Sequence, residues 1–365
     1  MIKFIGNQTQ FNNKVELCTI QECVDYCSSK AILGVDTETE GFDFTCKKMI
    51  MFQIGDAQEQ FVIDTRHVSI EPLREVLESH QITKIFHNAK FDYKFIRRWA
   101  GIECQNIYDT YLTEKVLHCG KQGHGYSLSR CCERYIGVTL DKEVRNKFVN
   151  LQGQPFTHNQ ITYGANDVAY LIQIWEKQHK LLDESDLVQV ADLENKAVIV
   201  FSEIEYEGLT VDKDSWIELA TDNLKKAQEY ELQLDREVIN HPKLSPHYHV
   251  PVQQDMFLQA EEQRATAIKW SSPAQILKLF QHLVPSLEDV NGKNLNKHRF
   301  KHDIIKSYIR YKELSKLANA YGTNFFNYVN CDGKVHTNFS QILDTGRVSS
   351  SGPNMLRNSF RAPGI

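Results

Sequence analysis

The sequence predicts an α/β domain built on a mixed sheet with flanking helices, followed by a mainly α-helical region and a short strand-containing end. Up to about residue 183, apolar runs typical of strands alternate with amphipathic patterns typical of helices. Beyond that point long helical patterns dominate, and the last part combines strand-like runs with a glycine turn. These changes divide the chain into residues 1–184, 185–330 and 331–365.

The first domain is expected to begin with a helix over residues 15–30 that leads into an apolar strand at 31–35. Two further strand-like runs, residues 49–56 and 60–65, are joined by only three residues, 57–59. A connection this short indicates a hairpin, and a hairpin makes the sheet at least partly antiparallel.

Helix and strand patterns continue to alternate through the rest of this domain. An amphipathic helix is expected at residues 70–80 and a strand at 83–89. Asn88 stands where it can cap the helix predicted at 89–100. Further elements are expected at residues 106–117, 127–137 and 158–182.

The second region is expected to be built from helices. One ends near Gly208, one runs from Asp214 to about Asn240, one starts at about residue 271, and one runs from His302 to Tyr321. Three prolines within residues 241–253 interrupt the helical pattern, which predicts a loop there.

Composition narrows the class of protein. Of 365 residues, 41% are hydrophobic and 24% are charged, as in a packed globular protein. Apolar runs long enough to span a bilayer are absent from the sequence, and the N-terminus lacks the apolar core of a signal peptide. The nine cysteines are scattered, without a Cys-x-x-Cys pair. We therefore expect reduced thiols in a cytoplasm and no membrane partner, rather than a disulfide framework or a zinc site.

The net charge of −5 argues against a uniformly basic nucleic-acid-binding surface, but the distribution of charge is uneven. Between Asn291 and Lys316 there are eight lysines or arginines and two acidic residues. Such a run forms either a solvated helix face or a surface that follows a phosphate backbone.

Carboxylates at alternate positions follow the first buried strand, in the stretch ILGVDTETEGFDF. Residues i and i+2 of a strand point to the same face, so Asp36 and Glu38 aim two carboxylates at one place. Two like charges in a buried place need a cation, and carboxylate oxygens suit Mg²⁺ or Mn²⁺. Acidic residues at a strand end are common, so this pair alone is weak evidence for a site.

Two more acidic residues lie in comparable contexts. Asp92 falls one turn into a helix that leaves a strand, and Asp167 lies within a helix. Tyr163 precedes Asp167 by four residues, so both side chains share one helix face. Taken singly, each acid is better explained as an exposed helix charge or a cap than as part of a site.

Taken together, these residues resemble the DEDD superfamily of 3′–5′ exonucleases, in its tyrosine-bearing branch. VDTETEGFD is similar to the first exonuclease motif, HNAKFD to the second and YGAND to the third, in the same order and on the same kinds of element. The resemblance implies a ribonuclease H-like sheet and catalysis by a fixed set of residues. That set is Asp36, Glu38, Asp92, Tyr163 and Asp167.

The same resemblance implies two divalent ions, Mg²⁺ or Mn²⁺, which would offset the four carboxylates and flank the scissile phosphate of a 3′ end. Asp36, Glu38, Asp92 and Asp167 would be the metal ligands, and Tyr163 would orient or help deprotonate the attacking water. Phe42 stands at the family's wedge position beside the terminal base, although a core phenylalanine is an equal reading. Asn88 matches the family's terminal-nucleotide contact, although a helix cap also explains it.

The second half resembles family A DNA polymerases of the bacterial DNA polymerase I type. FSEIEYEGLTVD is similar to the stretch that joins exonuclease to thumb, SSPAQILKLF and YKELSKLANAY are similar to thumb helices, and HTNFSQILDTGRVSS is similar to the start of the palm. The resemblance implies that Lys312 and Lys316 contact duplex phosphates and that Arg347 and Asn354 lie near the primer terminus. In this family the palm's metal-binding aspartate motif and the fingers follow FRAP, and here the sequence stops at Ile365.

Three readings follow from these resemblances. The first is the proofreading exonuclease and thumb of a family A polymerase, whose palm and fingers lie on a second chain or a longer product. This protein would act on single-stranded 3′ ends and primer–template DNA, in a bacterial or phage-infected cytoplasm. The second is a stand-alone nuclease of the ribonuclease D kind, and the third is a non-catalytic DNA-binding subunit.

Overall fold

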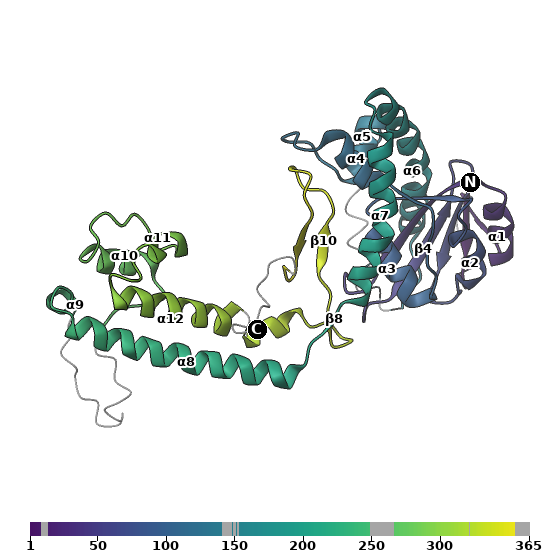
Figure 1. Cartoon of the computed structure of the whole chain (residues 1–365). Helices are drawn as coiled ribbons and strands as arrows, with labels where there is room; N and C mark the ends of the chain where they lie inside the picture. The colour runs from purple at the N-terminus through teal and green to yellow at the C-terminus, as the bar shows by residue number, and fades with distance from the viewer. Residues whose placement is uncertain are drawn as a thin grey trace. The chain divides into compact units, whose positions relative to one another are not determined.

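The structure is a computed structural model that describes residues 1–8, 14–140, 148, 151, 153–248, 266–320 and 322–354. The chain forms two compact units (Figure 1). The first contains residues 1–210 together with the described residues from Tyr328 onward, and the second runs from Val211 to Asn327. The compact units thus divide at 210 and 327, whereas the functional boundaries expected at 184 and 330 stay predictions.

A seven-stranded sheet forms the centre of the first unit, in the order β2-β1-β5-β4-β3-β6-β7. Its strands are β1 (Ile2–Ile5), β2 (Val15–Leu17), β3 (Ile32–Thr39), β4 (Met49–Gly55), β5 (Gln60–Asp64), β6 (Thr83–Phe86) and β7 (Ile107–Asp109). The β3–β4 and β4–β5 pairs are antiparallel and the other pairs are parallel. The expected mixed sheet is therefore confirmed, and β3 lies inside it between β4 and β6.

Helices cover both faces of this sheet (Figure 1). They are α1 (Ile20–Ser28), the 3₁₀ helix η1 (Glu71–Leu73), α2 (Arg74–Leu77), α3 (Ala89–Ala100), α4 (Thr110–His118), α5 (Leu128–Ile136), α6 (His158–Glu184) and α7 (Val188–Glu207). Strand β5 shows how the faces divide, because side chains alternate along a strand. Phe61 and Ile63 pack in the cluster that contains α3 residues, whereas Val62 packs with Ile161 and Ala165 of α6.

The segment that follows the second unit returns to the first. Its short strands are β9 (Lys334–Val335), which pairs with β8 (Leu209–Thr210), and the antiparallel pair β10 (Asn338–Ser340) and β11 (Ser349–Ser351). The buried carboxylate of Glu205 on α7 accepts hydrogen bonds from the Lys90 ammonium and from the Phe339 backbone N–H. One buried anion therefore joins α3, α7 and β10.

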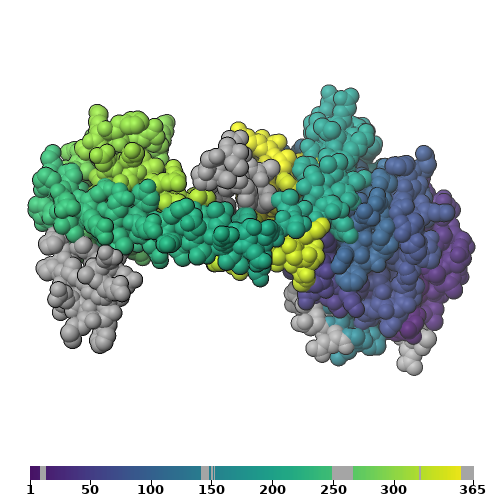
Figure 2. Space-filling view, turned by 60° about the horizontal axis from the view of Figure 1, so that its bottom comes forward, coloured from purple at the N-terminus to yellow at the C-terminus, as the bar shows by residue number. Residues whose placement is uncertain are grey.

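Helices make up most of the second unit. They are α8 (Lys213–Asn240), α9 (Ser245–Tyr248), α10 (Pro273–Gln281), α11 (Gly292–Asn296), α12 (Asp303–Ala320) and the 3₁₀ helix η3 (Thr323–Tyr328). Helix α8 forms much of the surface of this unit that is visible in Figure 2. Leu234 and Val238 of α8 pack against Ile305 and Tyr308 of α12, and the buried Asp235 carboxylate accepts a hydrogen bond from the Trp270 indole at 2.8 Å.

Two local predictions are wrong in part. Residues 15–17 form β2, and the helix expected over 15–30 is limited to α1, because the three-residue strand pairs with β1. The loop expected at 241–253 contains the short helix α9, and the part from residue 249 lies outside the described residues. Among the helices that the structure describes, none has the length and apolar character required to cross a membrane.

Candidate active site

The carboxylates of Asp36 and Glu38 lie on the part of β3 that extends past its neighbour β6. Pairing with β6 ends at Gly34, whereas pairing with β4 continues to Thr39. The register shifts between Glu38 and Thr39, which ends the regular strand just after the second carboxylate. Bulges of this kind often lie beside functional sites, because they redirect a side chain.

Two glycines bring Asp167 toward these carboxylates. A Cβ atom on Gly34 would stand 2.6 Å from the backbone oxygen of Val168, and one on Gly164 would stand 2.6 Å from Nε2 of Gln53. The contact with backbone at Gly34 excludes a side chain there, and at Gly164 a side chain would have to displace the end of Gln53, so α6 approaches β3 and β4 closely. Asp167, next to Val168 in the chain, is thereby placed against β3.

Three of the predicted metal ligands converge. One oxygen from each of Asp36, Glu38 and Asp167 lies within 4.8 Å of the other two. Glu38 and Asp167 are buried, with 8% and 4% of their surfaces exposed. Carboxylate oxygens are the ligands that Mg²⁺ and Mn²⁺ prefer, so this donor set fits a divalent cation of that class.

Asp92 is near this group but is not one of its three members. Its Oδ1 accepts hydrogen bonds from the Thr37 backbone N–H at 3.1 Å and from the Thr37 hydroxyl at 2.6 Å. Thr37 lies between the two strand carboxylates, so Asp92 approaches β3 from the α3 face. Burial, followed by the negative charge of Asp36, raises the pKa of Asp92 well above its ordinary value. A role for Asp92 as a metal ligand stays a prediction.

Tyr163 lies one helical turn before Asp167 on α6, as expected. Its ring is 6.1 Å from that of Phe148. The start of α6 is fixed by a capping box in which Thr157 and Gln160 exchange hydrogen bonds between side chain and backbone. A well-fixed helix start holds the position of Tyr163 and Asp167 relative to the sheet.

The N-terminus of α3 is capped by Asp109, and not by the Asn88 side chain. Asn88 occupies the N-cap position with a left-handed backbone, φ 70°, and without a capping hydrogen bond from its side chain. The Asp109 carboxylate instead accepts from the backbone N–H groups of Asn88 at 2.8 Å and Ala89 at 2.9 Å. It also accepts from Tyr111 N–H at 2.9 Å, at the start of α4. The sequence indicates that Asp109 caps α4, because it stands between a strand and a helix. It does not indicate that Asp109 also caps α3, because Ala89 lies 20 residues away in sequence.

The predicted nucleotide contacts are on the surface. Phe42 follows β3 and is 83% exposed, with its ring 6.4 Å from that of Phe91. The exposed side chain excludes the reading of Phe42 as a core residue. Asn88 is also exposed. Both side chains are therefore open to a ligand that approaches the end of β3 or the start of α3.

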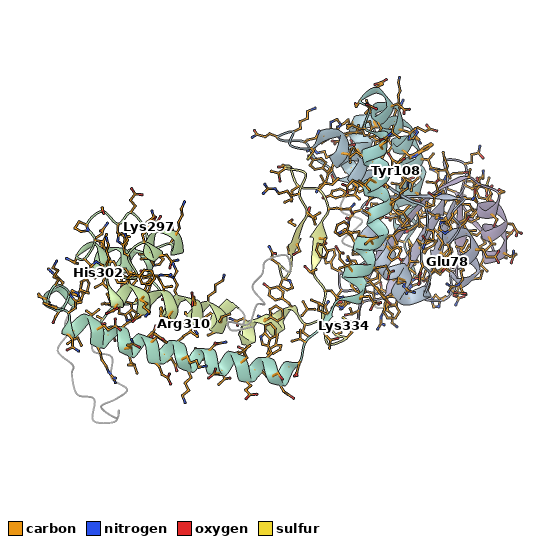
Figure 3. The ribbon with its side chains drawn as sticks, in the orientation of Figure 1. Glu78, Tyr108, Lys297, His302, Arg310 and Lys334 are labelled. Carbon is orange, nitrogen blue, oxygen red and sulfur yellow. The ribbon has the colours of Figure 1, made fainter. Side chains whose placement is uncertain are left out.

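The predicted duplex contacts lie in both units. Lys312 and Lys316 are exposed residues of α12, and the Lys312 ammonium donates to the Val290 carbonyl at 2.7 Å. Arg347 is exposed in the turn between β10 and β11, and Asn354 follows β11 and accepts from the Ser350 hydroxyl at 3.3 Å. Figure 3 shows Lys297 and Arg310, two further residues of the basic run, on the second unit. The contacts of all these residues with DNA stay predictions.

Two family models match this chain. One is described as 3′–5′ exonuclease and matches residues 16–183, and the other is described as DNA polymerase family A and matches residues 252–362. The first match contains all three converging carboxylates, and the second contains α10 to β11.

Curated relatives and solved structures agree with these matches. DNA polymerase I of Aquifex aeolicus is 24% identical over 94% of this chain, and that of Treponema pallidum is 26% identical over 78%. The chain spans 58% and 27% of their lengths. Ribonuclease D of Sphingobium indicum is 29% identical over 40% of this chain. The POL domain of Pol1 from M. smegmatis, solved with DNA primer-template and dNTP, shares the fold at 16% identity, with a TM-score of 0.68 over 99% of this chain.

The sheet, the three carboxylates and the matched model define the first unit as a 3′–5′ exonuclease domain. The chain therefore combines a region that matches the 3′–5′ exonuclease model with a region that matches part of DNA polymerase family A.

Proposed function

We propose that this chain is the proofreading part of a family A DNA polymerase and that it removes nucleotides from the 3′ end of DNA by hydrolysis. The observation that carries the proposal is the convergence of Asp36, Glu38 and Asp167, which lie on two elements more than 120 residues apart in sequence. Glu38 and Asp167 are buried and Asp36 is half-buried; carboxylates this close repel one another, and a bound cation offsets the repulsion.

Asp36, Glu38 and Asp167 would hold the divalent ion, Mg²⁺ or Mn²⁺, and Asp92 would help hold a second one. Such ions lower the pKa of a bound water and neutralise charge that develops on the leaving oxygen. Tyr163, on the same face of α6 as Asp167, orients the attacking water through its phenol group. A nucleoside 5′-monophosphate is the expected product.

The exposed Phe42 stacks beside the terminal base, and Asn88 contacts the terminal nucleotide. Lys312, Lys316, Arg347 and Asn354 contact primer–template DNA. We also propose that a second chain, or a longer product, supplies the palm and fingers needed for polymerisation.

The proposed location is a bacterial or phage-infected cytoplasm. The nine free thiols support this location, because thiols stay reduced there.

Hydrolysis of 5′-labelled single-stranded DNA in the presence of Mg²⁺ tests the proposal. We expect a ladder of products shortened from the 3′ end, which disappears in EDTA and in Asp36→Ala. Glu40→Gln is the matched control, because Glu40 belongs to the same acidic stretch but lies outside the three-carboxylate group. It should retain the ladder.

Two results would contradict the proposal. Degradation that persists in EDTA or in a folded Asp36→Ala variant would exclude metal-dependent catalysis at this site. Rapid hydrolysis of an RNA strand of the same sequence, with DNA left intact, would instead support an enzyme of the ribonuclease D kind.

A further inference from the structure

Two turns of the first unit bring two cysteines and an aspartate together, away from the three-carboxylate group. Asp43 and Cys46 lie in the turn that follows β3, and Cys331 lies in the turn between residues 329 and 335. One donor atom from each of the three lies within 4.8 Å of the other two. The scattered spacing of the cysteines in the sequence gives no sign of this cluster.

The distances between the donor atoms match those around a tetrahedral metal ion. Sγ of Cys46 is 3.5 Å and Sγ of Cys331 is 3.9 Å from Oδ2 of Asp43. Zinc–sulfur and zinc–oxygen bonds of about 2.3 and 2.1 Å, at a tetrahedral angle, separate sulfur from oxygen by about 3.6 Å. Both sulfur–oxygen distances are therefore close to those around a single tetrahedral ion, and the two sulfurs lie within 4.8 Å of each other.

The carboxylate of Asp43 is already oriented for this role. Its Oδ1 accepts hydrogen bonds from the backbone N–H of Thr45 at 2.9 Å and from the Thr45 hydroxyl at 2.6 Å. These contacts leave Oδ2 facing both thiols. Metal ligands in proteins are commonly held in this way by a hydrogen bond to their other atom.

Both turns are themselves closed by backbone hydrogen bonds. The Lys47 N–H donates to the Asp43 carbonyl at 2.8 Å, and the Gly333 N–H donates to the Asn330 carbonyl at 3.0 Å. Cys46 and Cys331 are exposed, so an ion from solvent has a path to both sulfurs.

We propose that Asp43, Cys46 and Cys331 form a binding site for one Zn²⁺ ion, with a fourth position open to water. Two thiolates favour zinc over the magnesium class, in contrast to the all-oxygen group on β3 and α6. The site is independent of the proposed exonuclease activity, because it shares no residue with the three-carboxylate group.

A second cluster of possible ligands, Glu114, His118 and His124, has a different character. Oε1 of Glu114 accepts from the Arg134 guanidinium and lies 2.7 Å from Nε2 of His124, and Oε2 accepts from the Tyr135 hydroxyl at 2.7 Å. The Arg134 guanidinium already pairs with the Glu114 carboxylate, so we interpret this cluster as structural.

Zinc at the proposed site would fasten the turn at 330–333 to the turn that follows β3. The segment is already attached to α7, because the Lys334 ammonium donates to the Glu207 carbonyl at 2.9 Å and Nδ1 of His336 lies 2.7 Å from the Glu205 carbonyl (Figure 3 shows Lys334). The metal therefore adds a link to an existing contact, and we expect it to raise the melting temperature of the protein.

Titration of the reduced, metal-free protein with Cd²⁺ tests the site, because cadmium bound by thiolate absorbs in the ultraviolet and cadmium bound by carboxylate does not. We expect an absorption that saturates at one equivalent and decreases when Zn²⁺ is present in large excess. Cys46→Ser and Cys331→Ser should each lose it. Cys119→Ser, which removes another exposed cysteine, and Asp36→Ala, which alters the carboxylate group, should retain it.

Several outcomes would overturn the proposal. These are a wild-type protein that shows no thiolate absorption with Cd²⁺, an absorption that survives in both folded variants, and an absorption that Cys119→Ser lowers to the same extent. The wild-type titration decides the question even where a serine variant fails to fold.

Discussion

Buried carboxylates on the two sides of β3 have different surroundings. On the α3 side, Glu205 accepts from the ammonium groups of Lys90 and Lys94, and Asp109 accepts from backbone N–H groups at two helix starts. On the α6 side, Asp36 and Glu38 face another carboxylate, Asp167, within 4.8 Å. In the first arrangement donor groups of the protein contact each negative charge, and in the second three negative charges lie close together.

This difference separates a structural acid from a functional one. A carboxylate surrounded by donors is stable where it lies, and its removal leaves buried donors without a partner. Carboxylates placed against one another cost free energy, and they are retained where they bind a cation. Loss of Glu205 or Asp109 should therefore reduce stability, whereas loss of Asp36, Glu38 or Asp167 should reduce activity.

The largest effect is expected for Asp167→Asn. The substitution removes one of three converging charges, so we expect exonuclease activity to fall by about a thousand-fold, in line with several kcal/mol of metal-assisted stabilisation. The free energy of unfolding measured in EDTA should stay the same or rise, since one repulsive charge is gone. Asp183→Asn, an exposed acid near the end of the same helix, should change neither quantity. A variant that is unfolded, or one that retains a tenth of the activity, would remove the contrast between the two sides.

Glu205→Gln tests the α3 side. Glu205 is fully buried and pairs with Lys90 and Lys94, so a neutral side chain leaves two ammonium groups without their anion. We expect the free energy of unfolding, measured by denaturant titration, to fall by about 3–5 kcal/mol. Glu207→Gln is the control, because Glu207 is exposed and 3.8 Å from its partner Lys334. It should cost at most about 1 kcal/mol, and equal costs for the two variants would refute the structural role of Glu205.

Local sequence patterns predict the mixed sheet and the long helices of both units. Residues 49–65 form the expected antiparallel pair β4 and β5, since their short connection leaves few alternatives. Local sequence patterns do not predict β2, because a strand of three residues has too little periodicity and its partner β1 lies elsewhere in the sequence. Strand order likewise depends on contacts that sequence spacing does not reveal.

The sequence likewise predicts some residues of the candidate site and its surroundings and misses others. Asp36 and Glu38 were placed together by strand geometry, Asp167 was joined to them by the family resemblance, and the structure brings all three together. Glu205 was missed because its partners Lys90 and Phe339 lie 115 and 134 residues away. Gly34 was missed because its importance arises from the approach of α6, which a strand pattern does not show.

Lys84 extends the comparison of buried charges from carboxylates to a cation. Its buried ammonium donates to the carbonyl oxygens of Ser79 and Ile82. Burial lowers the pKa of Lys84 to about 8, from an ordinary value of 10.5. Between these pH values the unfolded chain binds the proton and the folded chain does not, so this group adds stability as pH rises.

We expect the unfolding free energy of the wild type, minus that of Lys84→Met, to increase by about 2–3 kcal/mol from pH 7 to about pH 10. Lys177→Met, at an exposed position of α6, should give a difference that does not change with pH. A flat profile for Lys84→Met as well would mean that the ammonium is solvated in the folded protein.

The smallest effect is expected for Asp109→Asn, which keeps one acceptor oxygen and replaces the other by a donor. The amide then meets an N–H group of Ala89 or Asn88 at a place where the carboxylate accepted a hydrogen bond. We expect a loss of about 1–2 kcal/mol in the free energy of unfolding, the range for a lost helix cap. Asp25→Asn, an exposed change on α1, should stay within about 0.5 kcal/mol. Because α3 carries Asp92, Asp109→Asn should also slow exonuclease turnover, and full activity combined with full stability would show that α3 is positioned by its apolar contacts alone.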